Sequence, residues 1–515
     1  MFHLSSAGSR GRARHRRPRG AWLSVLAVAG VLALGVPGAS AAAVRAGGSP
    51  SAPSTPAAAG TYYSTTLNYV IRFYARWYTW FPEQLEQKTG LVNTEVSFIT
   101  GSSGLLGPPW RIYPGPNVDT VYAAVLDLDL SQGPEILTIP PTKSTYSTAS
   151  VDVWGDYAAP SPIPSGQPGT YALALPSWHG TLPPGVTRVN IAYPVSSFYV
   201  RADRYTNGVN MVASTKAFVA ALRLTSLPAY EADPSSGPTK LVPQAFAGLS
   251  AKAANDRAMR YTPTRYLRTL QTAMHSSSTR PLTSSDVALS KSFDDVFAAA
   301  QQAQGTGNPA PLAQMDRAVH DAYATVVSYF MSHTVGGSKW INFADAAQFG
   351  TDYLTRDAVA EFATGINNPA AAVYYFAYTD ACGAALNTQS VPSYRLTFSK
   401  AQIPDAKRFW SVTDYSPLSV VSLIQWPGVS RFPPSAKNVA SYTPGLVTNP
   451  DGSITIYIQP KAPANPSLYP NWLPAPARGP FAVWLRSYGP TGNTAVGANY
   501  VPPPIQPLGG SSCGS

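Results

Sequence analysis

The chain of 515 residues is poor in cysteine and histidine, which limits the chemistry that it can perform. Two cysteines, Cys382 and Cys513, cannot supply a multi-disulfide framework, so apolar packing must hold the fold together, and whether the two pair stays open. Only four of the six histidines lie beyond residue 20, and no His-Glu-x-x-His, Walker or dinucleotide glycine motif is present. We therefore expect no cofactor and no metal site built mainly from histidine, while a calcium site of carboxylates and carbonyls stays open.

Charged residues are scarce as well. They make up 12% of the chain, roughly half of the usual share of about 25%. The net charge of +11 overstates the positive charge of the body, because six arginines precede residue 20 in a stretch without acids. The remainder carries 11 − 6 = +5, and it holds no basic cluster interleaved with aromatic residues. This composition argues against nucleic acid as a partner.

The N-terminal 41 residues have the order of a secretory signal peptide. The basic stretch is followed by an apolar run, Ala21–Val36, and by Ala39-Ser40-Ala41, which fits the small-x-small cleavage pattern. The apolar run is shorter than the roughly 20 residues that a membrane-spanning helix needs. We expect residues 1–41 to be a signal peptide, residues 42–60 to be a disordered linker, and the mature protein to be secreted without a membrane span. An uncleaved anchor is the alternative, and the export route stays open.

Two periodicities divide the rest of the chain. Apolar residues recur every three or four positions from Tyr63 to Phe81, which predicts a helix that ends at Thr89-Gly90. From Thr120 the period changes to two, and short extended runs follow at roughly ten-residue spacing, which indicates a sandwich or barrel. Residues 206–365 are Ala-rich with helical spacing, and strands return after them, among them Leu418–Gln425.

These patterns predict an α+β protein with two β-sandwich-like lobes, a helical middle region and an N-terminal helix. The 29 tyrosines and 11 tryptophans argue against disorder of the body. The expected boundaries are an N-terminal helix plus β domain at 61–205, a helical region at 206–365, a C-terminal β domain at 366–505 and a flexible tail at 506–515.

The most distinctive stretch runs from Trp110 to Tyr122, where a Pro/Gly loop enters a strand. It also contains Arg111, Asn117 and Asp119. In one interpretation Asn117 and Asp119 cap the turn and set the strand register, as short Asx side chains do. In the other, Asp119 is an acid, a base or a ligand at a loop-strand junction, with Arg111 and Tyr122 beside it. Both interpretations stay open.

Two further aspartates are candidates for a functional site. Asp152 interrupts an alternating apolar strand, so its side chain either faces solvent or lies inward, hydrogen-bonded and with a raised pKa. Asp380 follows the aromatic run at 374–376 and precedes Gly383, a context that suits turn chemistry. It could also join Asp119 or Asp152 in a two-carboxylate site of the glycosidase kind.

Large aromatic residues with polar neighbours are candidates for a ligand cleft. Trp410 and Trp472 could stack sugars or apolar rings, or else anchor the core and its loops. Arg486 lies in Trp484-Leu485-Arg486-Ser487-Tyr488, between apolar residues of an expected strand. If Arg486 points inward, it needs an anionic partner, which could be a carboxylate of the protein or of a ligand.

The order of these motifs resembles proteins that join domain of unknown function 1254 to domain of unknown function 1214. In the N-terminal half the resemblance rests on Pro116-Asn117-Val118-Asp119-Thr120-Val121-Tyr122 and Trp178-His179-Gly180. In the C-terminal half it rests on Tyr394-Arg395-Leu396-Thr397-Phe398, Phe409-Trp410-Ser411-Val412-Thr413, Asn471-Trp472-Leu473-Pro474 and Arg486-Ser487-Tyr488. It covers most of residues 62–503 and implies a two-lobed body with β-sandwich units and helical elements. It implies no established catalytic residues.

Three functions fit these observations. The first is a secreted hydrolase acting on a glycan or related small molecule, with Asp119 and Asp380 as the proton-transfer pair in an aromatic-lined cleft between the lobes. The residues expected to position its substrate are Asn117, Tyr122, Arg111, Asp152, Trp410, Trp472 and Arg486. The second function is a non-catalytic binding module for polysaccharide or lipid. The third is a structural envelope protein that self-associates as a homo-oligomer.

Overall fold

The structure is a computed structural model that describes residues 59–94, 96–97, 115, 117–157, 161–237, 251–415 and 438–509. All of these residues fall within one compact unit. The expected signal peptide and most of the expected linker lie outside the described residues, as do Arg111, the expected strand Leu418–Gln425 and Cys513. No helix in the described ranges is both long and apolar enough to cross a membrane.

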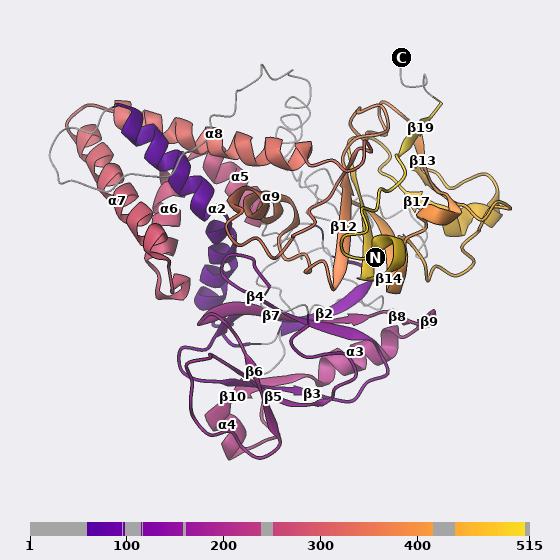
Figure 1. Cartoon of the computed structure of the whole chain (residues 1–515), viewed down its shortest axis with the longest axis horizontal. Coiled ribbons are helices and arrows are strands. Elements are labelled where there is room, and N and C mark those ends of the chain that lie inside the picture. The colour runs from indigo at the N-terminus through magenta and orange to yellow at the C-terminus, as the bar shows by residue number, and fades with distance from the viewer. Residues whose placement is uncertain are drawn as a thin grey trace, which may run out of the picture. The chain divides into compact units, whose positions relative to one another are not determined.

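A layer of helices is built around the N-terminal helix α2 (Ala59–Thr89). Its residues Tyr69, Phe73 and Tyr74 are buried against the helices of the middle region, because apolar side chains three and four positions apart share one face of a helix. Gly90, with φ of 71°, follows its last residue, as the sequence predicts. The helices beside α2 in Figure 1 are α5 (Ala251–Tyr261), α6 (Pro263–His275), α7 (Ser284–Gly305), α8 (Ala310–Ser332) and α9 (Tyr353–Ala363).

The N-terminal lobe is a sandwich of two four-stranded sheets. The first has the order β1 (Val96–Ser97), β2 (Thr120–Asp129), β7 (Val195–Asp203), β4 (Tyr146–Val151). The second has the order β10 (Arg223–Ser226), β3 (Glu135–Ile139), β5 (Gly169–Ala174), β6 (Val186–Asn190). Alternate residues such as Val121, Leu137 and Phe198 fill the core between them. The shorter elements are β8 (Tyr205–Thr206), β9 (Val209–Asn210), α3 (Val212–Ala221) and α4 (Leu227–Ala232).

The C-terminal lobe is a second sandwich. Its five-stranded sheet has the order β11 (Trp340–Ile341), β12 (Ala372–Ala377), β18 (Ala482–Pro490), β14 (Ala406–Tyr415), β15 (Val439–Ala440). Its four-stranded sheet has the order β17 (Trp472–Pro474), β16 (Ile454–Gln459), β13 (Ser393–Phe398), β19 (Gln506–Leu508). Leu396, Val412 and Leu485 belong to the core between the two sheets.

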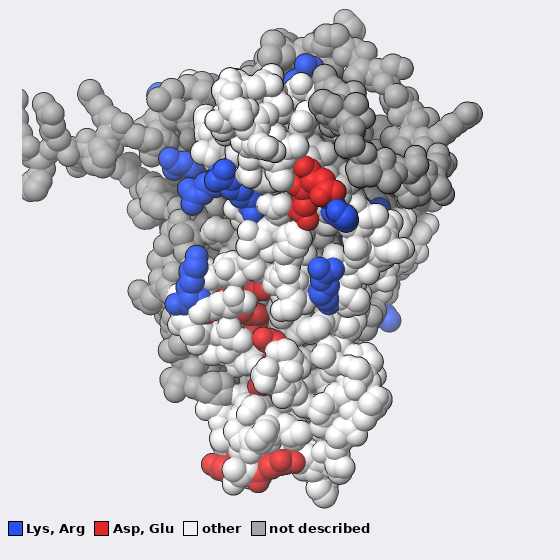
Figure 2. All heavy atoms as spheres, turned by 90° about the vertical axis from the view of Figure 1, so that its left-hand side faces the viewer, with Lys and Arg blue, Asp and Glu red and all other residues white. Residues whose placement is uncertain are grey.

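The predicted α+β class, with two β lobes, a helical middle region and an N-terminal helix, is confirmed. Two details differ from the expected boundaries. The N-terminal helix packs on the middle helices and so extends their layer, and residues 506–508 of the expected flexible tail form β19, which pairs with β13. Figure 2, which views the side where these helices lie in Figure 1, shows charged side chains in small groups on a mostly uncharged surface.

Candidate functional site

Charged and phenolic side chains gather where the outer faces of the two β lobes meet. On β18, Val483 and Leu485 point into the C-terminal sandwich, so Arg486 and Tyr488, which continue the alternation on the opposite face, point out of it. Arg201 of β7 likewise alternates with residues of the N-terminal core. We call this group the arginine–tyrosine cluster, and its members are Asn117, Asp119, Tyr122, Tyr157, Arg201, Asp203, Arg204, Asn367, Tyr374, Arg408, Ser411, Tyr415, Asn438, Tyr442, Arg486 and Tyr488.

Asp119 is fully buried and accepts hydrogen bonds from three side chains of the C-terminal lobe. Ser411 Oγ donates to Oδ2 at 2.7 Å, and Asn438 Nδ2 and the Tyr442 hydroxyl both donate to Oδ1. Burial and the adjacent Asp119 carboxylate raise the pKa of Tyr442 well above its usual value, so its phenol remains a donor. Because three donors stabilise the carboxylate, this arrangement suits an anchor between the lobes better than a general base.

Asn117 connects the loop before β2 to the C-terminal lobe. Its Oδ1 accepts a hydrogen bond from the Asp119 amide at 2.5 Å, which is the turn-capping geometry expected of a short Asx side chain. Its Nδ2 donates to the Tyr488 hydroxyl at 2.6 Å. Arg204 supports the same loop, since its Nη1 donates to the Val118 carbonyl at 2.9 Å. The motif around Asp119 therefore has a structural role in this fold.

The Arg486 side chain is 1% exposed, and it forms no ion pair with a carboxylate of the described residues. Its Nη2 donates to the Gly115 carbonyl at 2.9 Å, whereas Nε and Nη1 make no hydrogen bond of normal geometry with a described residue. The guanidinium lies 4.7 Å from the ring centre of Trp484 and 5.2 Å from that of Tyr415. Such cation–π contacts offset the loss of hydration only in part.

Arg201 is a second buried guanidinium held by neutral groups. Its Nη1 donates to Asn367 Oδ1, and its Nη2 donates to the Tyr157 hydroxyl at 3.1 Å and to the Gly365 carbonyl at 2.9 Å. Its Nε has no hydrogen-bond partner among the described residues. Tyr122 is its cross-strand neighbour on β2, and the guanidinium lies 5.5 Å from the centre of that ring.

A hydrogen-bonded network of phenols joins the two arginines. Asn367, which binds Arg201, also donates through Nδ2 to the hydroxyls of Tyr374 and Tyr488. These two tyrosines lie beside Arg486, which is the cross-strand neighbour of Tyr374. Burial, followed by the neighbouring Tyr374, raises the pKa of Tyr488 well above its usual value.

The cluster has an excess of positive charge. Arg408 forms an ion pair across the lobes with Asp203, which leaves Asp119 as the second carboxylate among the cluster's residues. Burial raises the pKa of Asp203, and the ion pair with Arg408 acts in the opposite direction. Four arginines face two aspartates, a difference of two positive charges. An anionic group would complete this arrangement chemically.

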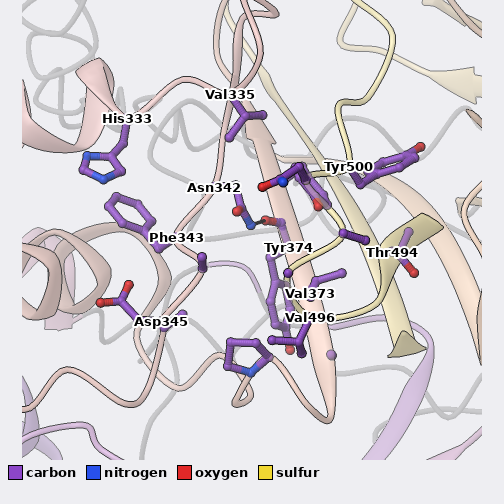
Figure 3. Close-up of a pocket in the computed structure, with 18 of the residues that line it drawn as sticks. His333, Val335, Asn342, Phe343, Asp345, Val373, Tyr374, Thr494, Val496 and Tyr500 are labelled. Carbon is purple, nitrogen blue, oxygen red and sulfur yellow. Dashed lines mark hydrogen bonds between the residues drawn. The ribbon is translucent and has the colours of Figure 1, made fainter. Parts of the chain in front are cut away.

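A cavity of about 480 Å³ opens along β12 and shares Tyr374 with the cluster. Figure 3 shows His333 and Phe343 on one side of it and Tyr500 on the other. His333 stacks on Phe343 with ring centres 4.7 Å apart. The described lining includes two aspartates and neither lysine nor arginine, so the cations that could hold an anion belong to the cluster and not to this cavity.

Asp380, the predicted partner of Asp119, has a different set of contacts. Its Oδ1 accepts hydrogen bonds from the amides of Cys382 at 2.9 Å and Ala384 at 3.0 Å, so it caps the turn after β12. Cys382 is disulfide-bonded. No described contact joins Asp380 to Asp119, and the two-carboxylate site therefore has no support from the described geometry.

Asp152, predicted to bind substrate, caps the turn after β4. Its Oδ1 accepts hydrogen bonds from the amides of Trp154 at 2.8 Å and Asp156 at 3.0 Å. Burial, followed by the nearby Asp156 carboxylate, raises the pKa of Asp152 to about 7. The residue makes no described contact with the cluster.

The two tryptophans predicted to line a cleft are buried in the C-terminal lobe. Trp410 packs in the core between the two sheets, with its ring centre 5.8 Å from that of Phe398. The indole of Trp472 donates to the Gln459 carbonyl at 2.8 Å. Neither makes a described contact with the cluster, which agrees with the core-anchor interpretation of such residues. Arg111 lies outside the described residues.

Of the site residues predicted from the sequence, Asn117, Asp119, Tyr122 and Arg486 lie in the cluster. The cluster also contains Arg201, Asn367 and Arg408, which the sequence analysis does not single out. A signal for Arg201 was present, because it interrupts an apolar strand in the same way as Arg486 does. Asn367 gave no such signal, since it lies in a loop that tertiary structure brings to the site. Within the described residues, no group of three or more histidine, cysteine, aspartate or glutamate side chains could hold a metal ion.

Comparisons with known proteins agree with the order of the motifs. Residues 100–226 match a protein of unknown function, DUF1254, and residues 371–492 match a protein of unknown function, DUF1214. The crystal structure of the VPA0106 protein from Vibrio parahaemolyticus is similar, with a TM-score of 0.51 and 16% identity over 87% of this chain and 100% of that chain. At that identity the likeness concerns the fold alone.

A crystal structure of an uncharacterized protein from Burkholderia cenocepacia aligns with a TM-score of 0.40 and 13% identity, over 87% of this chain and 93% of that chain. A search of curated proteins finds no match. The chain thus contains a DUF1254 region followed by a DUF1214 region, in the order that its motifs predict.

Proposed function

We propose that this protein is an exported binding protein that holds the anionic group of a small molecule in the arginine–tyrosine cluster. The observation that carries this proposal is Arg486, which is buried and forms no ion pair with a carboxylate of the described residues. Its Nε and Nη1 make no hydrogen bond of normal geometry there, and the group beside the guanidinium is the neutral phenol of Tyr415. Burying a charge without a partner costs several kcal/mol. A carboxylate or phosphate of a ligand would offset that cost by accepting charge-assisted hydrogen bonds.

The surrounding phenols fit the same ligand chemistry. Tyr488 keeps its proton because burial raises its pKa, and a protonated phenol can donate to an anion. Arg201 adds a second buried charge that is bound to neutral acceptors. In this proposal Asp119 has no chemical step to perform and instead fixes Ser411 and Tyr442 against the loop that contacts Arg486.

Export of the mature chain is part of the proposal and rests on the basic stretch, the apolar run Ala21–Val36 and the small-x-small site. The glycan hydrolase remains an alternative. It would need Asp119 and Asp380 to act as a pair, and the contacts of the two residues differ.

The test uses the mature chain, residues 42–515, with phosphate, citrate, acetate and the neutral sugar maltose, and measures the thermal unfolding midpoint and calorimetric binding. We expect at least one anion to raise the midpoint of the wild type by several degrees at a concentration about 100 times its Kd, since such binding adds about 2.7 kcal/mol of stability. The variant Arg486→Gln should lose this response. Arg395→Gln, which changes an exposed arginine of the same lobe, should keep it.

Circular dichroism establishes that each variant is folded. An anion response that persists in Arg486→Gln would refute the proposed site. Binding of maltose by all three proteins, with no response to any anion, would favour the polysaccharide-binding alternative instead.

A further inference from the structure

A second candidate site lies in the helical layer and uses none of the residues of the cluster. It is a groove of about 840 Å³ between α2, α5 and α6. One wall consists of apolar side chains of α2, with Trp77 stacked on Phe81 and on Tyr266 of α6 at ring-centre distances of 5.7 and 6.1 Å. Trp80 and Leu85 extend this wall along the helix. The aromatic side chains of this wall are themselves largely buried and contact one another, so the wall is packed and apolar.

The opposite side of the groove offers little hydrogen bonding. Ala254 and Ala258, one turn apart on α5, leave room because their side chains are small. Thr269 and Thr272 of α6 use their hydroxyls within the helix, where they donate to backbone carbonyls four residues earlier at 3.1 and 2.9 Å. Away from Gln84 and the charged residues of the lining, a ligand body with many hydroxyls, such as a sugar, would therefore find few partners, whereas an alkyl chain needs none.

The charged residues of the groove all have the same sign. Lys88, Arg257 and Arg265 are exposed, contribute to its lining and make no ion pair within the described residues, and the described lining contains no aspartate or glutamate. Two acids of the same helices form ion pairs elsewhere. Glu83 pairs with Arg76 at 2.6 Å and Asp256 pairs with Lys252 at 3.2 Å. The groove thus combines an apolar wall with uncompensated cations.

We propose that this groove binds a free fatty acid, with the alkyl chain along the aromatic wall of α2 and the carboxylate beside the cations. The apolar wall accounts for the chain, and the three cations with no acid in the lining account for the anionic head. The proposal concerns a site different from the cluster and a ligand with a long apolar chain. It does not require the cluster to bind anything.

The probe is laurate, below its micelle concentration, titrated into the mature chain in a calorimeter. We expect one laurate site, and binding of dodecyltrimethylammonium, which has the same chain and the opposite charge, at least about tenfold weaker. The variant Arg257→Gln/Arg265→Gln should raise the Kd for laurate about fivefold, the range expected for two partly exposed charge contacts. Arg268→Gln is the matched control, because Arg268 is exposed on the same helix and is not part of the lining.

Fluorescence locates the bound chain. Laurate brominated along its chain should quench only a minority of the tryptophan emission, since Trp77 and Trp80 are the tryptophans of the groove among ten in the mature chain. The variant Trp77→Phe/Trp80→Phe should remove that quenching while laurate still binds, because phenylalanine keeps the wall apolar.

Four outcomes would overturn the proposal. The first is equal affinity for laurate and dodecyltrimethylammonium, and the second is laurate affinity that Arg257→Gln/Arg265→Gln leaves unchanged. The third is binding to anionic vesicles without binding of free laurate, which would make the groove a membrane-contact surface. Loss of laurate binding in Arg486→Gln with no loss in the groove variants would place laurate in the cluster, and would refute the groove without refuting the proposed function.

Discussion

Replacing Asp127 by asparagine tests how the buried carboxylates of the N-terminal lobe set the stability of the protein. Asp127 is 1% exposed, and neither of its carboxylate oxygens has a hydrogen-bond partner of normal geometry among the described residues. Burial, followed by the nearby carboxylates of Glu83 and Asp129, raises its pKa to about 7. Glu86 of α2 lies beside it, and burial with the Asp127 charge raises the pKa of Glu86 as well.

The sign and size of the effect follow from linkage. A carboxyl group whose pKa is raised on folding contributes stability below its unfolded value of 3.8, and this contribution is lost as the pH rises through about 7. The full shift corresponds to about 4 kcal/mol at pH 8, because each pKa unit is worth about 1.4 kcal/mol. Asparagine has the same shape and no charge, so Asp127→Asn should be about 2–4 kcal/mol more stable than the wild type at pH 8 and nearly equal to it at pH 4.

The assay is urea unfolding of the mature chain at both pH values, with the midpoint compared between proteins. Asp451→Asn is a control of opposite sign, because Asp451 is exposed and hydrogen bonds from Ser453 lower its pKa. A variant that is no more stable than the wild type at pH 8 would refute the reasoning. A gain of equal size at pH 4 and pH 8 would refute it as well, since ionisation could not then be the cause.

Other substitutions separate the roles of the cluster and the core. Arg486→Met should raise the unfolding free energy of the ligand-free chain by about 1–3 kcal/mol, as apolar replacements of buried charges often do, while calorimetry shows loss of anion binding. Tyr442→Phe removes a donor to Asp119 and should lower the urea midpoint by the equivalent of about 1–2 kcal/mol. Trp410→Ala should cost about 3–5 kcal/mol of stability in the same assay and leave the anion Kd of the folded protein unchanged; a changed Kd would place Trp410 in the ligand site.

Local patterns in the sequence predict the strands well, even where a strand is irregular. In β2, apolar residues alternate at Val121, Ala123 and Val125 and then resume at Leu128. The pairing of β2 with β7 shifts between Val125 and Leu128, so the break in the alternation marks a bulge. Both faces of the strand remain buried, one in the sandwich core and the other against the rest of the fold, and this explains why Asp127 can be enclosed.

The members of the site were harder to predict, because alternation separates two faces of a strand without saying what covers each. In the motif Phe409-Trp410-Ser411, the sequence favours the tryptophan as the residue that contacts a ligand. In the fold Trp410 faces the sandwich core, and the neighbouring Ser411 faces Asp119. Asp380 and Asp152 are candidates because they are acids among aromatic residues, yet in the fold their carboxylates accept hydrogen bonds from amides of their own turns.

The junction between the two lobes explains in physical terms several of the motifs that this chain shares with the DUF1254 and DUF1214 families. The loop that contains Gly115, Asn117 and Asp119 belongs to the DUF1254 region, and its partners Ser411 and Arg486 belong to the DUF1214 region. Separated from each other, the regions would leave the Asp119 carboxylate without its donors and the guanidinium of Arg486 without its carbonyl. Burial of both groups is therefore compensated only when the lobes are joined, so these motif residues encode the junction between the two lobes.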